Sequence, residues 1–181
     1  MTIRRVTFIR SMMLAAVLVA VGAWSPSHPA AAAAASFNCI PVGGTFMTNL
    51  GAIGGTSVPS TTLGRVTGAL SGAVAATIAN VQQSGGNFVF TVQHHIVTDE
   101  GDFVFANEAQ ATAMPVQGAP HPLFAIVTYP VHITGGTGKF AHATGDITNI
   151  GEVQVPNFAS GDLSGGTLIL RYSGQICFAT P

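Results

Sequence analysis

The stretch HITGGTGKFAHATGDI (residues 132–147) decides between two classes of protein, because its glycines and its lysine fit either a phosphate-binding loop or a turn between strands. A Walker loop requires the pattern G-x-x-x-x-G-K followed by Ser or Thr. Here Gly138 and Lys139 are followed by Phe140, and Ile133 stands five positions before Gly138. Two required residues are missing, so this pattern is excluded.

A dinucleotide-binding fingerprint can also be read from Gly136, but it should open a long helix within a βαβ unit. The chain instead runs from Gly145 into a segment that alternates like a strand. We therefore predict a tight turn between two strands, in which glycines 135, 136 and 138 permit positive φ. One helical turn would place Phe140 in the core.

Most of the chain from Gly43 onward repeats with a period of two residues, which is the pattern of β-strands. No segment of this region carries a convincing helical stripe. Turn-forming residues between the strands suggest a closed barrel or a sandwich. We favour an all-β fold, a single antiparallel closed β-barrel of about eight strands, because closure removes exposed edges. The expected strands lie near residues 43–50, 64–80 (one strand or two), 87–98, 103–113, 123–134, 145–155 and 166–178.

The N-terminus has the three parts of a secretory signal peptide. Three arginines at positions 4, 5 and 10 precede an apolar stretch, and an alanine-rich segment with A-x-A cleavage sites follows. A membrane-spanning helix needs about 20 apolar residues, and this stretch is shorter. We therefore predict a signal peptide over residues 1–35 and one mature domain over residues 36–181. The mature domain should be secreted and should have no membrane span.

The mature domain would carry few charges. Its three cations, Arg65, Lys139 and Arg171, stand against seven carboxylates, which gives a net charge of −4. Binding to nucleic acid needs clustered Lys and Arg, and so does docking on an anionic membrane. We expect neither partner. We also expect no cofactor, because both nucleotide-binding patterns fail.

The only two cysteines, Cys39 and Cys177, stand at opposite ends of the mature domain. In the oxidising compartment that an exported protein meets, an even number of cysteines indicates a disulfide. A bridge between the ends would stabilise the fold by about 4 to 5 kcal/mol in the chain-entropy treatment. We predict a Cys39–Cys177 bridge. The alternative, two buried free thiols, requires the two ends to lie apart.

A hairpin register predicts which side chains face the interior. If residues 99–102 connect two strands and Thr98 pairs with Phe103, then His94 lies opposite Asn107 on an aromatic and apolar face. The same register pairs Ile96 with Phe105 and Val92 with Ala109. A turn longer by one residue would swap the faces and bring Gln93, His95 and Glu108 inside.

Two interpretations of this face remain open. An apolar cavity with a few convergent polar groups is the usual ligand site, so His94 and Asn107, together with Tyr129, Arg171 and Tyr172, could orient a small hydrophobic or phenolic ligand. Alternatively, the barrel is filled, and His94 and Asn107 satisfy each other, since buried polar groups need hydrogen bonds.

We expect no metal site. The adjacent histidines His94 and His95 point to opposite faces of a strand, so they cannot both bind one ion unless the strand bulges there. At most one of them could join another ligand such as His132, whereas zinc normally has three or four protein ligands.

The glycine-rich turn also resembles a known motif. ITGGTGKFAHATGDI (133–147) is similar to the hairpin pattern GGTG-[KR]-F-x-x-A-x-G of allene oxide cyclase barrel-like and dirigent-like proteins, especially their small exported bacterial members. The segments VTDEGDFVFANEAQATAMP (97–115) and GTLILRYSGQICF (166–178) also resemble this group, so the likeness covers roughly residues 85–178. His142 departs from the pattern, since a small residue is expected there.

The resemblance implies an eight-stranded antiparallel barrel with an apolar cavity. Plant members of the group either cyclise a fatty-acid epoxide or guide the radical coupling of phenols without being oxidants. Some members oligomerise, so the resemblance also implies a homodimer or homotrimer. No plant catalytic position aligns with this chain, and no catalytic residue is carried over.

Three functions follow as hypotheses. The first is an exported, non-catalytic barrel that binds a small apolar or phenolic molecule or steers its chemistry. The second is a cofactor-free cyclase or isomerase that acts in the same cavity. The third is a structural cell-surface module with a filled barrel. An ionisable group deep in an open cavity would favour the enzyme, and an open cavity without one would favour binding.

Overall fold

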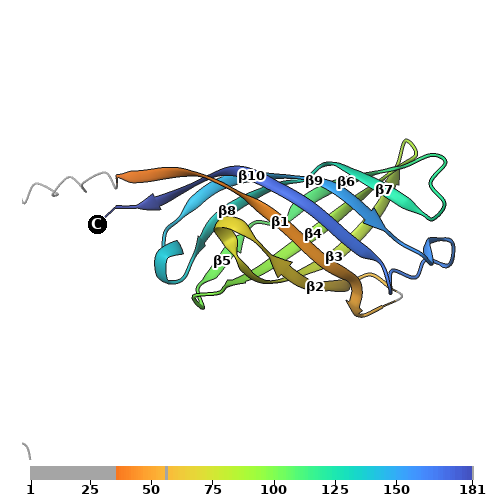
Figure 1. The fold of residues 1–181 in the computed structure, drawn as a ribbon, viewed down its shortest axis with the longest axis horizontal. Coiled ribbons are helices and arrows are strands. Elements are labelled where there is room, and N and C mark those ends of the chain that lie inside the picture. Colours follow the sequence, from red (N-terminus) through yellow and green to blue (C-terminus); the bar gives the residue numbers. More distant parts are fainter. Residues whose placement is uncertain (1–35, 56, 181) are drawn as a thin grey trace, which may run out of the picture. The chain divides into compact units, whose positions relative to one another are not determined.

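The computed structural model describes residues 36–55 and 57–180, so the predicted signal peptide over residues 1–35 lies outside the described residues. The described part is all-β, with ten antiparallel strands in one sheet (Figure 1). None of its helices is long and apolar enough to cross a bilayer. The strands are β1 (Phe37–Ile53), β2 (Ser60–Val66), β3 (Gly72–Ser84), β4 (Asn87–Thr98), β5 (Phe103–Ala106), β6 (Ala109–Pro115), β7 (Leu123–Thr128), β8 (Pro130–Gly136), β9 (Thr144–Gln154) and β10 (Thr167–Ala179). Three single turns of 3-10 helix join them: η1 (Gly68–Leu70), η2 (Gly138–Phe140) and η3 (Phe158–Ser160).

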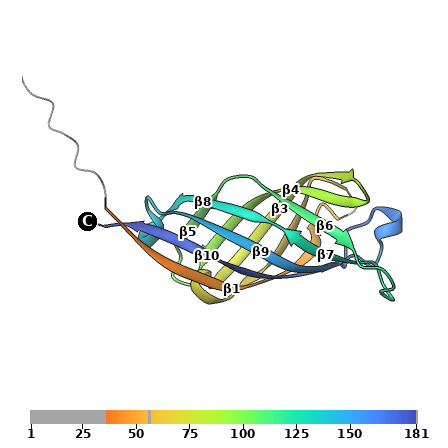
Figure 2. The same ribbon diagram turned by 90° about the horizontal axis from the view of Figure 1, so that it is seen from above.

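The strand pairings form a ring through eight strands. Strands β1 to β4 pair in order, and β10 pairs with both β1 and β9. Between β4 and β9 the ring runs through β6 and β7 at one end, and through β5 and β8 at the other (Figure 2). We call these the β6–β7 end and the β5–β8 end.

Two interruptions explain why ten strands make a ring of eight. The first consists of Asn107 and Glu108, the two residues between the end of β5 and the start of β6. The second lies at Tyr129, where β7 ends and β8 begins with Pro130. Proline has no N–H group to donate to a strand ladder, so a proline tends to lie at the start of a strand. The single expected strands over residues 103–113 and 123–134 are therefore each divided in two.

The other expected strands are confirmed, with small differences in length. The expected strand at residues 87–98 coincides with β4, and the expected segment at 64–80 forms β2 and β3. Strand β1 is longer than expected because it pairs with β10 along its whole first part, from Phe37 opposite Ala179 to Asn49 opposite Thr167.

The glycine-rich stretch is a turn between two antiparallel strands, as predicted. Strands β8 and β9 pair with His132 opposite Asp146, and η2 forms the helical turn between them. Phe140 is 1% exposed and lies in the core. His142 is an exposed turn residue with a φ of 61°.

The backbone of this turn binds an anionic group of the same chain, the carboxylate of Asp102. The backbone N–H of Lys139 donates to the carboxylate of Asp102 at 3.2 Å. Gly138 has a φ of 51°, and a Cβ at this position would lie 1.9 Å from a carboxylate oxygen of Asp102. Gly136 differs from its neighbours: its φ is not positive, and it is required because a Cβ would lie 2.0 Å from the carbonyl oxygen of Phe103.

The turn at 137–142 and the turn at 99–102 share further bonds. The backbone N–H of Phe103 donates to the hydroxyl of Thr137 at 2.8 Å, and the N–H of Thr137 donates to the carbonyl of Phe103 at 2.9 Å. Lys139 also pairs with Glu100, with 3.2 Å between Nζ and Oε2. We refer to these two turns, joined in this way, as the turn pair.

Large side chains fill the interior at the β5–β8 end. The rings of Phe46 and Tyr172 lie 5.1 Å apart. The Tyr172 hydroxyl accepts a hydrogen bond from the N–H of Leu70 at 3.0 Å and donates one to the carbonyl of Thr67 at 2.9 Å. Tyr172 is therefore an internal support for the segment around η1.

The predicted disulfide is confirmed. Cys39 and Cys177 lie directly opposite each other on β1 and β10 and are bonded. The bridge joins residues that are 138 positions apart, so it closes most of the described chain into one loop.

Removing the bridge should therefore destabilise the fold strongly. For Cys39→Ser with Cys177→Ser we expect the free energy of unfolding to fall by about 5 kcal/mol, because the unfolded chain regains the entropy of a long loop. Urea unfolding of the mature domain measures the change, with the reduced wild-type domain as the control. A loss below about 1 kcal/mol would show that the strand ladder alone supplies the stability.

Tyr172→Phe should also destabilise the domain. The substitution keeps the ring but leaves the N–H of Leu70 and the carbonyl of Thr67 without their partner, and we expect a loss of about 1 to 3 kcal/mol. Urea unfolding tests this, and an unchanged midpoint and slope would contradict it.

Candidate functional site

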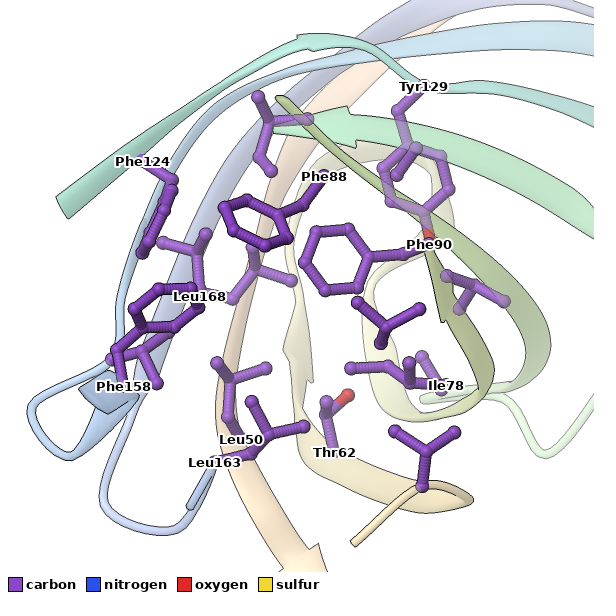
Figure 3. A pocket seen from close by; sticks show the side chains of 18 of the residues that line it. Leu50, Thr62, Ile78, Phe88, Phe90, Phe124, Tyr129, Phe158, Leu163 and Leu168 are labelled. Atoms are coloured by element: carbon purple, nitrogen blue, oxygen red, sulfur yellow. The ribbon is translucent and has the colours of Figure 1, made fainter. Parts of the chain in front are cut away.

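A cavity of about 200 Å³ lies in the interior toward the β6–β7 end of the ring. Side chains from most strands of the ring and from η3 line it (Figure 3). Among the described residues of the lining, only Thr62 and Tyr129 carry a polar side-chain atom, and none is charged. The cavity is therefore suited to an apolar molecule.

Aromatic side chains form one side of this cavity. Phe88 from β4, Phe124 from β7 and Phe158 from η3 pack against one another, with ring centroids 4.7 to 5.5 Å apart. Figure 3 shows Phe124 and Phe158 on one side of the space and Tyr129 and Phe90 on the other. Phe88 and Phe158 are partly exposed, so this cluster lies between the cavity and the solvent.

Two of the buried residues that line the cavity have small side chains. Ala76 on β3 and Ala111 on β6 are both buried and both line the space. Alternation along the strands points them inward. These two short side chains leave part of the space that larger inward residues would fill.

Next to this space lies a much smaller cavity of about 20 Å³ with a more polar lining. Its polar lining residues are Thr48, His94, Tyr129 and Asn149. The two cavities adjoin, because Ala76, Tyr129 and Leu168 line both.

His94 and Tyr129 form a hydrogen-bonded pair in the small cavity. The Nε2 atom of His94 and the hydroxyl oxygen of Tyr129 are 2.5 Å apart. Burial, with a smaller contribution from His95, lowers the pKa of His94 from 6.5 to about 4. Burial also raises the pKa of the Tyr129 hydroxyl. Both side chains are therefore uncharged at neutral pH.

Four buried polar atoms in the described part of the chain have no hydrogen-bond partner. They are Oγ1 of Thr48, Oγ1 of Thr62, Nδ1 of His94 and Oδ1 of Asn149. Three of these residues line the small cavity, and Thr62 lines the large one. Unpartnered buried polar atoms are uncommon, so three of them around one small cavity indicate a place where a polar group can bind.

The five predicted ligand-binding residues are dispersed. His94 and Tyr129 lie together in the small cavity, and Tyr129 also lines the large one. Tyr172 is buried but lines neither cavity, and its hydroxyl bonds the backbone near η1. Asn107 and Arg171 are exposed and line neither cavity.

The predicted register is right for β6 and wrong for β5. Val92 pairs with Ala109 as expected, whereas Ile96 pairs with Val104 instead of Phe105. The difference begins at the turn, where Phe103 pairs with Val97 instead of Thr98, and one extra residue in the interruption at Asn107 and Glu108 restores the expected register in β6. Asn107 therefore does not lie against His94, and its N–H donates to the carbonyl of His132 instead.

The polar lining residues Thr48 and Asn149 were missed. Asn149 shares a strand face with Ile147 and Val153, so alternation alone could have placed it inside. The alternative register is also wrong in placing Glu108 and His95 inside, since both are exposed.

Comparison of the chain with models of known protein families, with curated proteins and with solved structures finds no match. The resemblance to allene oxide cyclase-like and dirigent-like proteins therefore stays a prediction.

The lowered pKa of His94 predicts a pH dependence of stability. In the unfolded chain His94 takes up a proton near pH 6.5, but in the folded protein it does so only near pH 4. The contribution of His94 to the free energy of unfolding should therefore be at its maximum above pH 6.5. It should decrease as the pH drops toward 4, by about 2 kcal/mol between pH 7 and pH 4.5.

Urea unfolding at the two pH values measures this contribution. His94→Gln should remove it, whereas His95→Gln, at the exposed neighbouring position, should keep most of it. Equal pH dependence in the wild type and in His94→Gln would show that His94 is not the responsible group.

Proposed function

We propose that the ring is a closed eight-stranded β-barrel, and that the protein binds one small apolar molecule in the large cavity, or steers its chemistry, without catalysing a reaction. One observation carries this proposal: a cavity of about 200 Å³ whose described lining is apolar apart from Thr62 and Tyr129. Apolar cavities with few polar groups are the usual form of small-molecule sites.

The volume limits the size of the ligand. An apolar cavity of about 150 Å³ is large enough for benzene. A cavity of about 200 Å³ therefore suits a somewhat larger molecule, such as one with two fused rings. Pockets for drug-sized ligands have volumes of about 300 to 1,000 Å³, so this smaller cavity would not enclose a large lipid.

We further propose that this protein acts outside the cell. Its support is the charge and length pattern of residues 1–35 and the Cys39–Cys177 bridge, since disulfides persist in oxidising compartments. Membership of the allene oxide cyclase-like and dirigent-like group, and assembly into a homo-oligomer, belong to the same proposal and rest on the sequence resemblance.

The two other functions fit less well. A structural module with a filled barrel does not account for the large cavity. A cofactor-free cyclase or isomerase is favoured by one observation, the His94–Tyr129 pair next to the cavity. Because both groups are neutral at pH 7, this pair is better suited to hydrogen bonding than to carrying a charge, and we keep the enzyme as the second candidate.

Naphthalene is a suitable first probe, because it is apolar and has two fused rings. Equilibrium dialysis of the mature domain against naphthalene should show saturable binding. Ala111→Leu should weaken it by about tenfold or more, since the added carbons occupy the cavity.

The matched control is Ala73→Leu, which makes the same change at an exposed position of β3. It should bind naphthalene like the wild type. Absence of saturable binding to the wild type, or equal binding by both variants, would contradict the proposed function.

A further inference from the structure

Three hydrogen-bonding atoms without partners belong to residues that line the small cavity, whereas the large cavity has one, Oγ1 of Thr62. Thr48 is 4% exposed and Asn149 is 2% exposed, and the unpartnered atoms of both are buried. The unpartnered Nδ1 of His94 belongs to the same lining. These three side chains come from β1, β9 and β4, so strands from different parts of the ring converge on one point.

The chemistry of these atoms limits what can satisfy them. The side-chain N–H of Asn149 donates to the carbonyl of Tyr129 at 3.0 Å, which leaves Oδ1 as an acceptor in need of a donor. The hydroxyl of Thr48 can both donate and accept. Nδ1 of His94 donates or accepts according to which ring nitrogen carries the proton. A group that donates once and also accepts would match this set, and a hydroxyl does both.

Charged groups do not match. No Asp, Glu, Lys or Arg is among the described residues that line either cavity, so a buried carboxylate or ammonium would have no counter-ion. A carboxylate would also place its negative charge near Oδ1 of Asn149. Burying an unpaired charge costs several kcal/mol, far more than burying a bonded hydroxyl.

The size of the small cavity agrees with a single polar group. Its volume of about 20 Å³ corresponds to one water-sized group. Because Ala76, Tyr129 and Leu168 line both cavities, an apolar body in the large one would lie next to this point.

We propose that the small cavity is a subsite for the hydroxyl group of the ligand, held by Thr48, Asn149 and His94. The ligand is then an uncharged apolar alcohol or phenol, neither a hydrocarbon nor a carboxylic acid. This inference rests on the proposed binding function, and it adds the chemical class of the molecule bound.

The test compares three probes of the same ring size: naphthalene, 2-naphthol and 2-naphthoate. The single tryptophan of the chain, Trp24, lies before residue 36, so the fluorescence of 2-naphthol can be followed without tryptophan emission from the mature domain. At pH 7 we expect 2-naphthol to bind about tenfold more tightly than naphthalene, and 2-naphthoate to bind at least about tenfold more weakly than 2-naphthol.

Thr48→Val removes the subsite hydroxyl and keeps the shape of the side chain. It should abolish most of the preference for 2-naphthol and leave naphthalene binding unchanged. Thr62→Val is the matched control, because Thr62 is also buried and unpartnered but lines only the large cavity. The control should keep the preference.

The outcomes separate the two proposals. If naphthalene and 2-naphthol bind the wild type equally, the inference is wrong while the proposed function stands, and the small cavity serves an internal water only. A preference that is lost in Thr62→Val but kept in Thr48→Val would place the polar contact in the large cavity and also overturn the inference. If no probe binds, both proposals fail.

Discussion

The ladder between β1 and β10 is the interaction on which the rest of the structure depends. These strands pair over 13 residue pairs, and β10 uses its other edge to pair with β9. Without this ladder the sheet would have two long edges, and its inner face would be open to solvent. The disulfide joins Cys39 and Cys177 across the same ladder. The ring of strands is therefore closed by hydrogen bonds and by a covalent bond between the same two strands.

Closure fixes a limited interior, and the size of the inward side chains decides how it is used. At the β5–β8 end Phe46 and Tyr172 pack against each other and leave little space. On β6 the buried residue Ala111 is small, and it lines the large cavity at the other end. The same alternating backbone therefore supports a packed core at one end and a cavity at the other. The polar side chains of the small cavity lie near the boundary, where Tyr129 contacts both spaces.

Sequence reasoning predicted the features that depend on local patterns. Period-two alternation located the strands, the failed phosphate motifs identified the turn around Phe140, and the cysteine count identified the bridge. The site was predicted only in part. His94 lies on the inward face expected for it, but Asn107 lies in the interruption between β5 and β6 and is exposed, and such an interruption has no signature in the alternation. Asn149 was missed because its contact with the other lining residues depends on ring closure, which joins residues far apart in the chain.

The turn pair also has a consequence for local motion. Two connections that are more than thirty residues apart share backbone and side-chain hydrogen bonds, through Phe103 with Thr137 and through Asp102 with Lys139. Neither connection can open without breaking bonds of the other. The two turns should therefore exchange their amide hydrogens as a single cooperative unit, although loops that are far apart in a chain usually open independently.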